Sequence, residues 1–140
     1  MRSKKVTRYW CDFCNKASLR ANSMAKHEKH CTLNPKRSCR VCTIINGGDG
    51  CDIEALKSLL PDPTEFLNTQ YFTGTENAES RLVEALQQAM PAVREDADNC
   101  PACIMAALRQ KQIPVPMVEG FDFKAEMQSV FATYKDDRYC

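Results

Sequence analysis

Residues 11–31 read CDFCNKASLRANSMAKHEKHC and contain five side chains of the types that bind zinc. Cys11 and Cys14 come first, and the segment HEKHC at 27–31 then offers His27, His30 and Cys31. A closed tetrahedral zinc site takes four ligands, so two of these last three complete it. On a helix Cys31 lies four residues after His27, and three to five residues usually separate the last two ligands. We therefore predict a site of Cys11, Cys14, His27 and Cys31, with His30 left on the surface.

The segment from Tyr9 to Cys31 resembles a CCHC zinc finger with finger spacing, a family whose members often carry His-Glu-Lys before the last cysteine. Tyr9 stands where the family has an aromatic residue, and Met24 stands where it has a leucine. Ser18 occupies the position of a second aromatic residue, with Leu19 beside it. The resemblance implies a ββα-like finger, and this departure predicts a small core that leans on the rest of the protein.

Charge divides the chain unevenly. The first 42 residues carry eleven Lys and Arg against two Asp and Glu, a net charge of +9, whereas the remainder carries eight against sixteen, a net charge of −8. A basic segment of this kind indicates a polyanionic partner such as DNA or RNA. The resemblance implies that base-reading side chains of the finger helix are Arg20, Asn22, Ser23 and Lys26. The arm before the finger adds three more candidate nucleic-acid contacts, Lys4, Lys5 and Arg8.

A second set of possible zinc ligands consists of two C-x-x-C pairs, namely Cys39, Cys42, Cys100 and Cys103. The 57 residues between the pairs are tolerable, because the cost of closing a loop grows slowly with its length. A helix that starts at the later pair would favour its thiolates. The arrangement resembles treble-clef and zinc-ribbon sites, so we expect a second zinc ion. Cys51 could replace one ligand, and Cys140 is expected to have no role.

The fold class expected from these motifs is a small zinc-binding, α-rich (α+β) protein. A basic arm and CCHC finger fill 1–35, and a helical body clamped by the four-cysteine site fills 36–140. The first cysteine pair is expected to form a knuckle at 39–42. The apolar TII at 43–45 before the turn-rich NGGDG at 46–50 indicates a strand and a tight hairpin turn.

Two helices are expected in the insertion at 52–90. Asp52 is a suitable cap for the first, which Pro61 ends, and Thr75 is a possible cap for the second, which ends before Pro91. Their apolar stripes are Ile53, Leu56, Leu59 and Leu60 in the first helix and Leu82, Val83, Leu86, Ala89 and Met90 in the second.

Three further segments complete the expected body. REDADN at 94–99 is expected as a solvated loop, and a helix with Pro101 in its first turn follows the second cysteine pair. IPVP at 113–116 is expected to be extended, because each proline disfavours helix in the residue before it. A final helix at 122–135 would present an inward stripe of Phe123, Met127, Val130, Phe131 and Tyr134.

Two segments of the sequence resemble enzymatic motifs but do not match them. HEKH spaces its histidines at i and i+3, whereas metalloproteases need i and i+4, and the residues near His27 and Cys100 do not match the zinc-deaminase pattern. CPAC at 100–103 lacks the parallel-sheet pattern of a thioredoxin-like fold. Both predicted zinc sites are filled by protein ligands, so we expect no catalytic zinc and no small-molecule substrate.

The nine cysteines occur mostly as pairs, and the chain begins without the apolar stretch of a secretory signal. We therefore expect a cytoplasmic protein, in a reducing compartment and not associated with membranes. Its predicted function is non-enzymatic nucleic-acid binding through the basic finger, in a regulatory role. The alternative is a protein-interaction or assembly adaptor whose zinc sites are purely structural. The continuation TLNPKRSCRVC also resembles small, uncharacterised proteins of phages and other mobile elements, which suggests no activity.

Overall fold

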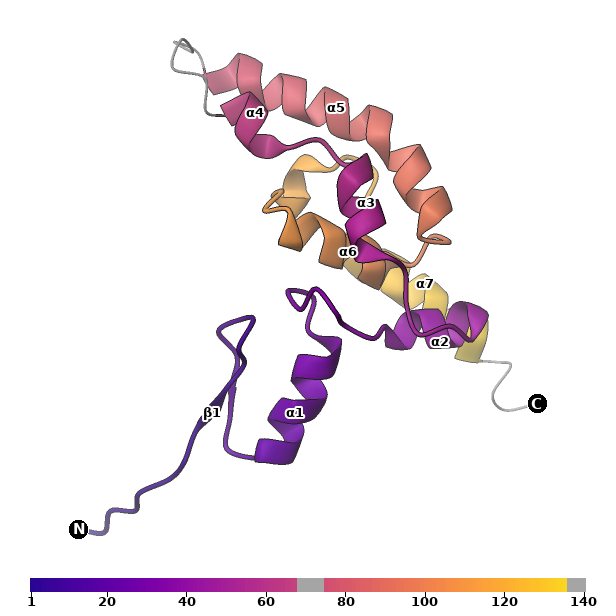
Figure 1. The fold of residues 1–140 in the computed structure, drawn as a ribbon. Helices are drawn as coiled ribbons and strands as arrows, with labels where there is room; N and C mark the ends of the chain where they lie inside the picture. The colour runs from indigo at the N-terminus through magenta and orange to yellow at the C-terminus, as the bar shows by residue number, and fades with distance from the viewer. Residues whose placement is uncertain (68–74, 136–140) are drawn as a thin grey trace.

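The chain begins with an exposed arm that leads into a two-stranded ribbon and a helix (Figure 1). The computed structural model describes residues 1–67 and 75–135. Strands β1 (Tyr9–Trp10) and β2 (Ala17–Ser18) are antiparallel, and helix α1 (Ala21–His30) packs against both. This is the ββα-like arrangement that the resemblance to a CCHC finger implies.

The interior of the finger is small. Its buried residues are Cys11, Met24 and Cys31, with Cys14 and Leu33 packed beside them. Met24 therefore points inward as expected. No aromatic side chain takes part in this cluster, and Leu33 comes from beyond the helix, so the finger core depends on the chain that leads into the body.

The body consists of six helices and one short 3-10 turn among the described residues (Figure 1). In chain order they are α2 (Arg40–Asn46), α3 (Ile53–Leu59), α4 (Pro63–Leu67), α5 (Thr75–Asp96), α6 (Pro101–Gln110), η1 (Val115–Met117) and α7 (Phe123–Lys135). Helix α6 contacts α3 and α7, and α5 lies along α3 and α4. Helix α2 rests on α7.

Helix α6 is the centre of the core. Seven of its residues are buried, and they are distributed around the helix: Pro101, Ala102, Cys103, Ile104, Ala106, Ala107 and Leu108. A helix that is apolar on all sides must be surrounded by other elements. Leu56 of α3 and both Leu82 and Leu86 of α5 supply that cover, and all three are fully buried. The second cysteine pair thus lies at the start of the helix that forms the centre of the core.

Local signals set the ends of α3. The Asp52 side chain accepts a hydrogen bond from the Ala55 amide at 3.2 Å, which confirms the predicted cap. At the other end the Lys57 carbonyl accepts from the Leu60 amide at 3.2 Å, and the Lys111 ammonium donates to the carbonyl oxygens of both Lys57 and Leu60. Leu59 was predicted to face the core but is 40% exposed.

The prediction of a strand and hairpin after the first cysteine pair is wrong, because residues 40–46 form α2. The Cys39 sulfur accepts from the Cys42 amide and so starts the helix. Gly47 ends it in the left-handed region, with φ 74°. The glycine-rich segment then returns the chain to the cysteines, where the Cys39 amide donates to the Asp49 carbonyl at 2.7 Å. The turn residues therefore cap a helix and do not join two strands.

The second helix of the insertion was predicted to end before Pro91. This prediction is also wrong, because α5 continues through Pro91 to Asp96. An internal proline costs a helix about 3 kcal/mol. The extra turn buries Val93 completely, and burial of one such side chain recovers about 1.5–3 kcal/mol. The expected loop at 94–99 is accordingly short, with Asp98 and Asn99 at positive φ.

The remaining elements follow the sequence more closely. Helix α7 matches the expected range, and Phe123, Met127 and Val130 pack against the core, whereas Phe131 is 48% exposed. The segment expected to be extended instead contains the 3-10 turn η1. The connector after α3 includes the short α4, and its residues 68–74 lie outside the described part, as do Cys140 and the side chain of Tyr134.

Candidate metal centres

The structure brings the four predicted finger ligands together. Cys11 and Cys14 lie on the turn between β1 and β2, His27 projects from α1, and Cys31 follows its last residue. Their ligand atoms all lie within 4.8 Å of one another. The Cys14 sulfur is 3.2 Å from His27 Nε2, near the edge of about 3.5 Å for a tetrahedral zinc with S and N ligands. This first centre could hold a metal ion and is compatible with zinc.

Backbone contacts shape the turn that carries its two cysteines. The Phe13 amide donates to the Cys11 sulfur at 3.4 Å, and the Cys11 amide donates to the Lys16 carbonyl at 2.9 Å. The Glu28 carboxylate of α1 accepts from the Asp12 amide at 3.0 Å. One of the two acidic side chains in the basic segment is therefore occupied in joining the turn to the helix.

Two ligands of the first centre, His27 and Cys14, have pKa values shifted in the direction that favours metal binding. Burial lowers the pKa of His27, and the positive charge of Lys16 lowers it further, which favours the neutral imidazole that a metal needs. For Cys14, burial acts to raise the pKa, but hydrogen bonds from the Lys16 backbone, Cys11 and Cys31 outweigh it and the pKa is lowered. Burial raises the pKa of Cys31.

His30 lies outside the four-ligand set, but it is half-buried and not on the open surface as we predicted. Its Nδ1 lies 2.8 Å from the Ser38 carbonyl oxygen, and its own carbonyl accepts from Arg37 Nε at 3.3 Å. The Ser38 amide in turn donates to the Lys29 carbonyl at 2.9 Å. His30 therefore fixes the path of the chain between the two centres, a contact that ligand spacing does not reveal.

The second centre consists of the four predicted cysteines, Cys39, Cys42, Cys100 and Cys103, whose sulfurs lie within 4.8 Å of one another. Each is at least 99% buried. The Cys39 and Cys100 sulfurs are 3.6 Å apart, and those of Cys42 and Cys103 are 3.4 Å apart. The edge of a zinc tetrathiolate is about 3.8 Å, whereas a disulfide needs about 2.05 Å. The spacing therefore fits a metal-ion tetrahedron and not a pair of disulfides.

Both pairs start helices, Cys39 before α2 and Cys100 before α6. In the treble-clef and zinc-ribbon arrangements that the sequence resembles, a knuckle presents the first pair, and we expected such a knuckle at 39–42, where α2 begins instead. Two helix N-termini direct free amides and positive dipole ends toward the thiols. The centre thus joins the start of the body to its most buried helix across 57 intervening residues.

The thiols of the second centre compete for protons. Hydrogen bonds from Cys100, Cys39 and Cys51 lower the pKa of Cys103. The pKa of Cys100 is raised, first of all by the hydrogen bond between Cys100 and Cys103. Burial and the contact with Cys103 raise the pKa of Cys42 to about 12. Negative charge on one thiol therefore opposes charge on the others, and a bound cation relieves that opposition.

Cys51 is a fifth thiol at the margin of this centre. Its sulfur lies 3.6 Å from that of Cys42 and donates to the Ala97 carbonyl at 3.5 Å. The hydrogen bond to Cys103 and then burial raise the pKa of Cys51. The structure thus places Cys51 beside the four ligands, as the sequence suggested, but in contact with a backbone acceptor of its own.

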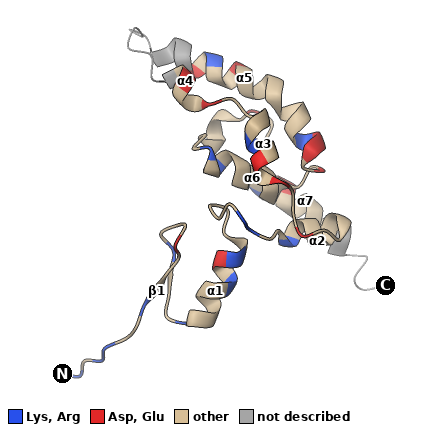
Figure 2. Ribbon diagram, in the orientation of Figure 1, with Lys and Arg blue, Asp and Glu red and all other residues tan. Residues whose placement is uncertain are grey.

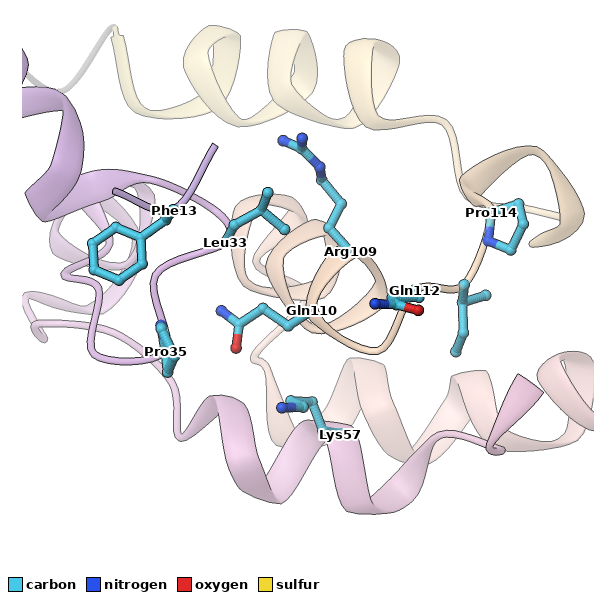
Figure 3. Close-up of a pocket in the computed structure, with 9 residues that line it drawn as sticks. Phe13, Leu33, Pro35, Lys57, Arg109, Gln110, Gln112 and Pro114 are labelled. Carbon is cyan, nitrogen blue, oxygen red and sulfur yellow. The ribbon is translucent and has the colours of Figure 1, made fainter. Parts of the chain in front are cut away.

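The finger is held against the body by polar contacts that sequence reasoning missed. Arg109 Nη1 donates to the Thr32 hydroxyl at 2.6 Å. Gln110 Nε2 donates to the carbonyls of Thr32 and Asn34 at 3.0 and 3.1 Å. A groove of about 650 Å³ runs along this junction, with Phe13 at one end and Pro114 at the other (Figure 3). These contacts attach the finger, whose own core is small, to helix α6 of the body.

The predicted nucleic-acid residues are all accessible. Arg20, Asn22, Ser23 and Lys26 are exposed along α1, and so are the arm residues Lys4, Lys5 and Arg8. Figure 2 shows blue positions along the arm, with most red positions on the body. The inward face of α1 carries Met24 and His27 instead, so metal binding and an outer contact surface do not compete for the same side chains.

Comparisons with protein-family models, curated proteins and solved structures found no match. No helix in the described residues is both long and apolar enough to cross a membrane.

Proposed function

We propose that both centres hold zinc in a structural role and that the protein has no enzymatic activity. The donor sets, three sulfurs with one imidazole nitrogen and four sulfurs, are those that zinc favours. A catalytic zinc keeps a position open for water, whereas each of these centres has four protein ligands. Deep burial of the second set further limits access to it.

We further propose that the chain binds nucleic acid through its basic N-terminal finger, in a regulatory role. The observation that carries this proposal is the open outer face of α1, where Arg20, Asn22, Ser23 and Lys26 are exposed in a segment of net charge +9. Phosphate neutralisation by such a segment supplies affinity, and side chains on an exposed helix supply base contacts. The net charge of +9 already includes the two acidic residues, of which Glu28 accepts a hydrogen bond from the Asp12 amide.

The alternative function is a protein-interaction or assembly adaptor. It is favoured by the charge of −8 on the remainder of the chain, which suits a basic partner. The two functions differ in their response to salt, because contacts with phosphates release counterions and weaken steeply as salt rises.

Fluorescence anisotropy with labelled DNA and RNA oligonucleotides tests the proposal. We expect binding at low salt, and at least a several-fold loss for the double variant Arg20→Ala with Lys26→Ala at unchanged zinc content. Removal of residues 1–8 deletes four basic side chains. The salt dependence should then flatten by up to about 0.9 in log–log slope for each phosphate that the protein no longer neutralises.

Lys124→Ala is the matched control, since it removes an exposed positive charge from α7 in the body. Its affinity should equal that of the unmodified protein. An unmodified protein that binds no nucleic acid at low salt, or finger variants that bind as well as the control, would favour the adaptor instead.

A further inference from the structure

The ribbon of the finger exposes an apolar outer face. Trp10 pairs with Ala17 across the ribbon, and side chains directly opposite one another share a face. Adjacent residues point to opposite faces, so this is the face turned away from Cys11 and its metal centre. Trp10 is 58% exposed and Leu19 is 60% exposed. If the register is extended by one residue pair beyond Tyr9 and Ser18, Leu19 lies opposite Arg8, and both lie on the same face as Trp10.

This exposure is not explained by the metal centre. Trp10 is the one tryptophan of the chain, and burying an aromatic side chain is among the most favourable contacts a small domain can make. The finger has a weak core, with Leu33 and Met24 as its non-ligand apolar residues, yet its largest side chain lies outside it. An exposed indole in that setting is available to a ligand.

The charges around this face indicate what the ligand is. Lys4, Lys5 and Arg8 are exposed in the arm that runs into β1. Exposed acidic groups are scarce here, since Asp12 and Glu28 are the acidic residues among the first 42. An indole flanked by cations complements a polyanion that also presents flat aromatic surfaces. Unpaired nucleotides combine those two properties.

We propose that the outer face of the ribbon binds single-stranded nucleic acid, with a base stacked on Trp10 and adjacent phosphates held by Arg8 and the arm lysines Lys4 and Lys5. In a duplex the bases are stacked on each other, and inserting an indole between them costs a few kcal/mol of unstacking. An unpaired base avoids that cost, and stacking is tolerant of base identity. This inference rests on the proposed nucleic-acid function and specifies its substrate as an unpaired strand.

The lone tryptophan also supplies the assay. The full zinc-loaded chain is titrated with a mixed-sequence 12-nucleotide DNA, the same sequence as RNA, and the matching DNA duplex, all at low salt. Tryptophan fluorescence reports on Trp10 alone, and anisotropy of a labelled oligonucleotide reports total binding independently. We expect quenching by a single strand and tighter binding of that strand than of the duplex.

Trp10→Ala should weaken single-strand binding by about 5- to 150-fold, the range for loss of one base–aromatic stack. Trp10→Phe should recover part of the affinity, and zinc content should stay unchanged because Trp10 is exposed. Phe131→Ala is the control, because Phe131 is an exposed aromatic residue on α7 of the body.

Three outcomes separate this inference from the proposed function. Binding without quenching, and with unchanged affinity for Trp10→Ala, would overturn the stacking face but leave nucleic-acid binding intact. Tighter binding of the duplex than of either single strand would overturn the preference for unpaired bases. Absence of any binding by anisotropy at low salt would overturn both proposals.

Discussion

Replacing Cys42 and Cys51 separately tests which sulfur completes the second centre. Cys42 is 99% buried and its sulfur lies 3.4 Å from that of Cys103, whereas the thiol of Cys51 donates to the Ala97 carbonyl. We predict that Cys51→Ala keeps two zinc ions per chain and that Cys42→Ala keeps one. Both variants remove one thiol from the same small region, so each serves as the control for the other.

The expected magnitudes differ widely. Cys51→Ala removes a weak thiol hydrogen bond to Ala97 and a little apolar packing, about 1 kcal/mol in the free energy of unfolding. Cys42→Ala removes one of four ligands from a site whose zinc binding contributes about 10–16 kcal/mol to folding in comparable peptides. Loss of even a third of that amount approaches the whole stability of a small domain, about 5–15 kcal/mol. We therefore expect the body of Cys42→Ala to lose cooperative unfolding.

The assay is zinc per chain by elemental analysis after dialysis against a chelator of moderate affinity, followed by urea unfolding. One zinc ion in Cys51→Ala, or two in both Cys42→Ala and the double variant, would refute the ligand assignment. The double variant distinguishes the causes of zinc retention in Cys42→Ala. If Cys42→Ala keeps two zinc ions and the double variant keeps one, Cys51 substitutes for the lost ligand.

Two further predictions concern the finger and the packing of α7. Cys31→Ala should remove the finger zinc, because Cys31 is a buried member of the four-ligand set, while His30→Ala should keep it and lose about 1 kcal/mol of stability with one hydrogen bond. Elemental analysis and chemical unfolding check both, and the reverse result would make His30 the ligand. Glu126→Gln should lower the free energy of unfolding by about 1 kcal/mol, because it removes the negative charge that pairs with Arg94 and one of the two oxygens that accept its hydrogen bonds at 2.7 and 3.2 Å. Urea unfolding with equal zinc content measures this, and an unchanged midpoint would show that the pair contributes nothing.

The candidate ligands could be predicted from the sequence because their geometry is local. C-x-x-C presents two sulfurs from one turn, and His27 and Cys31 are separated by one helical turn, so spacing alone brings each pair together. The clustering of Cys39 and Cys42 with Cys100 and Cys103 needed one further assumption, that the chain closes over 57 residues. Thiol chemistry justified that assumption, because two C-x-x-C pairs that form no disulfides are uncommon in a protein without a metal.

The sequence predictions of secondary structure were wrong at segments whose local residue pattern is compatible with two structures. TII before a glycine-rich segment suits either a hairpin or a helix with a left-handed cap, and the Cys39 sulfur selected the helix by accepting from the Cys42 amide. Pro91 disfavours a helix locally, but packing of Val93 behind it outweighs that preference. Long-range contacts of this kind have no signature in a window of neighbouring residues.

The segment between the centres shows why the finger cannot be interpreted as an independent module. Cys31 is a ligand of the first centre, and the adjacent His30 holds the Ser38 carbonyl one residue before Cys39, a ligand of the second. Arg37 spans the same gap, since its Nε donates to the His30 carbonyl and its Nη1 lies 4.0 Å from the Cys103 sulfur. A shift at one centre is therefore transmitted to the ligands of the other through a few fixed backbone atoms. The proposed nucleic-acid surface of the finger is therefore joined to the acidic body through these contacts, and variants of His30 or Arg37 are expected to affect both parts.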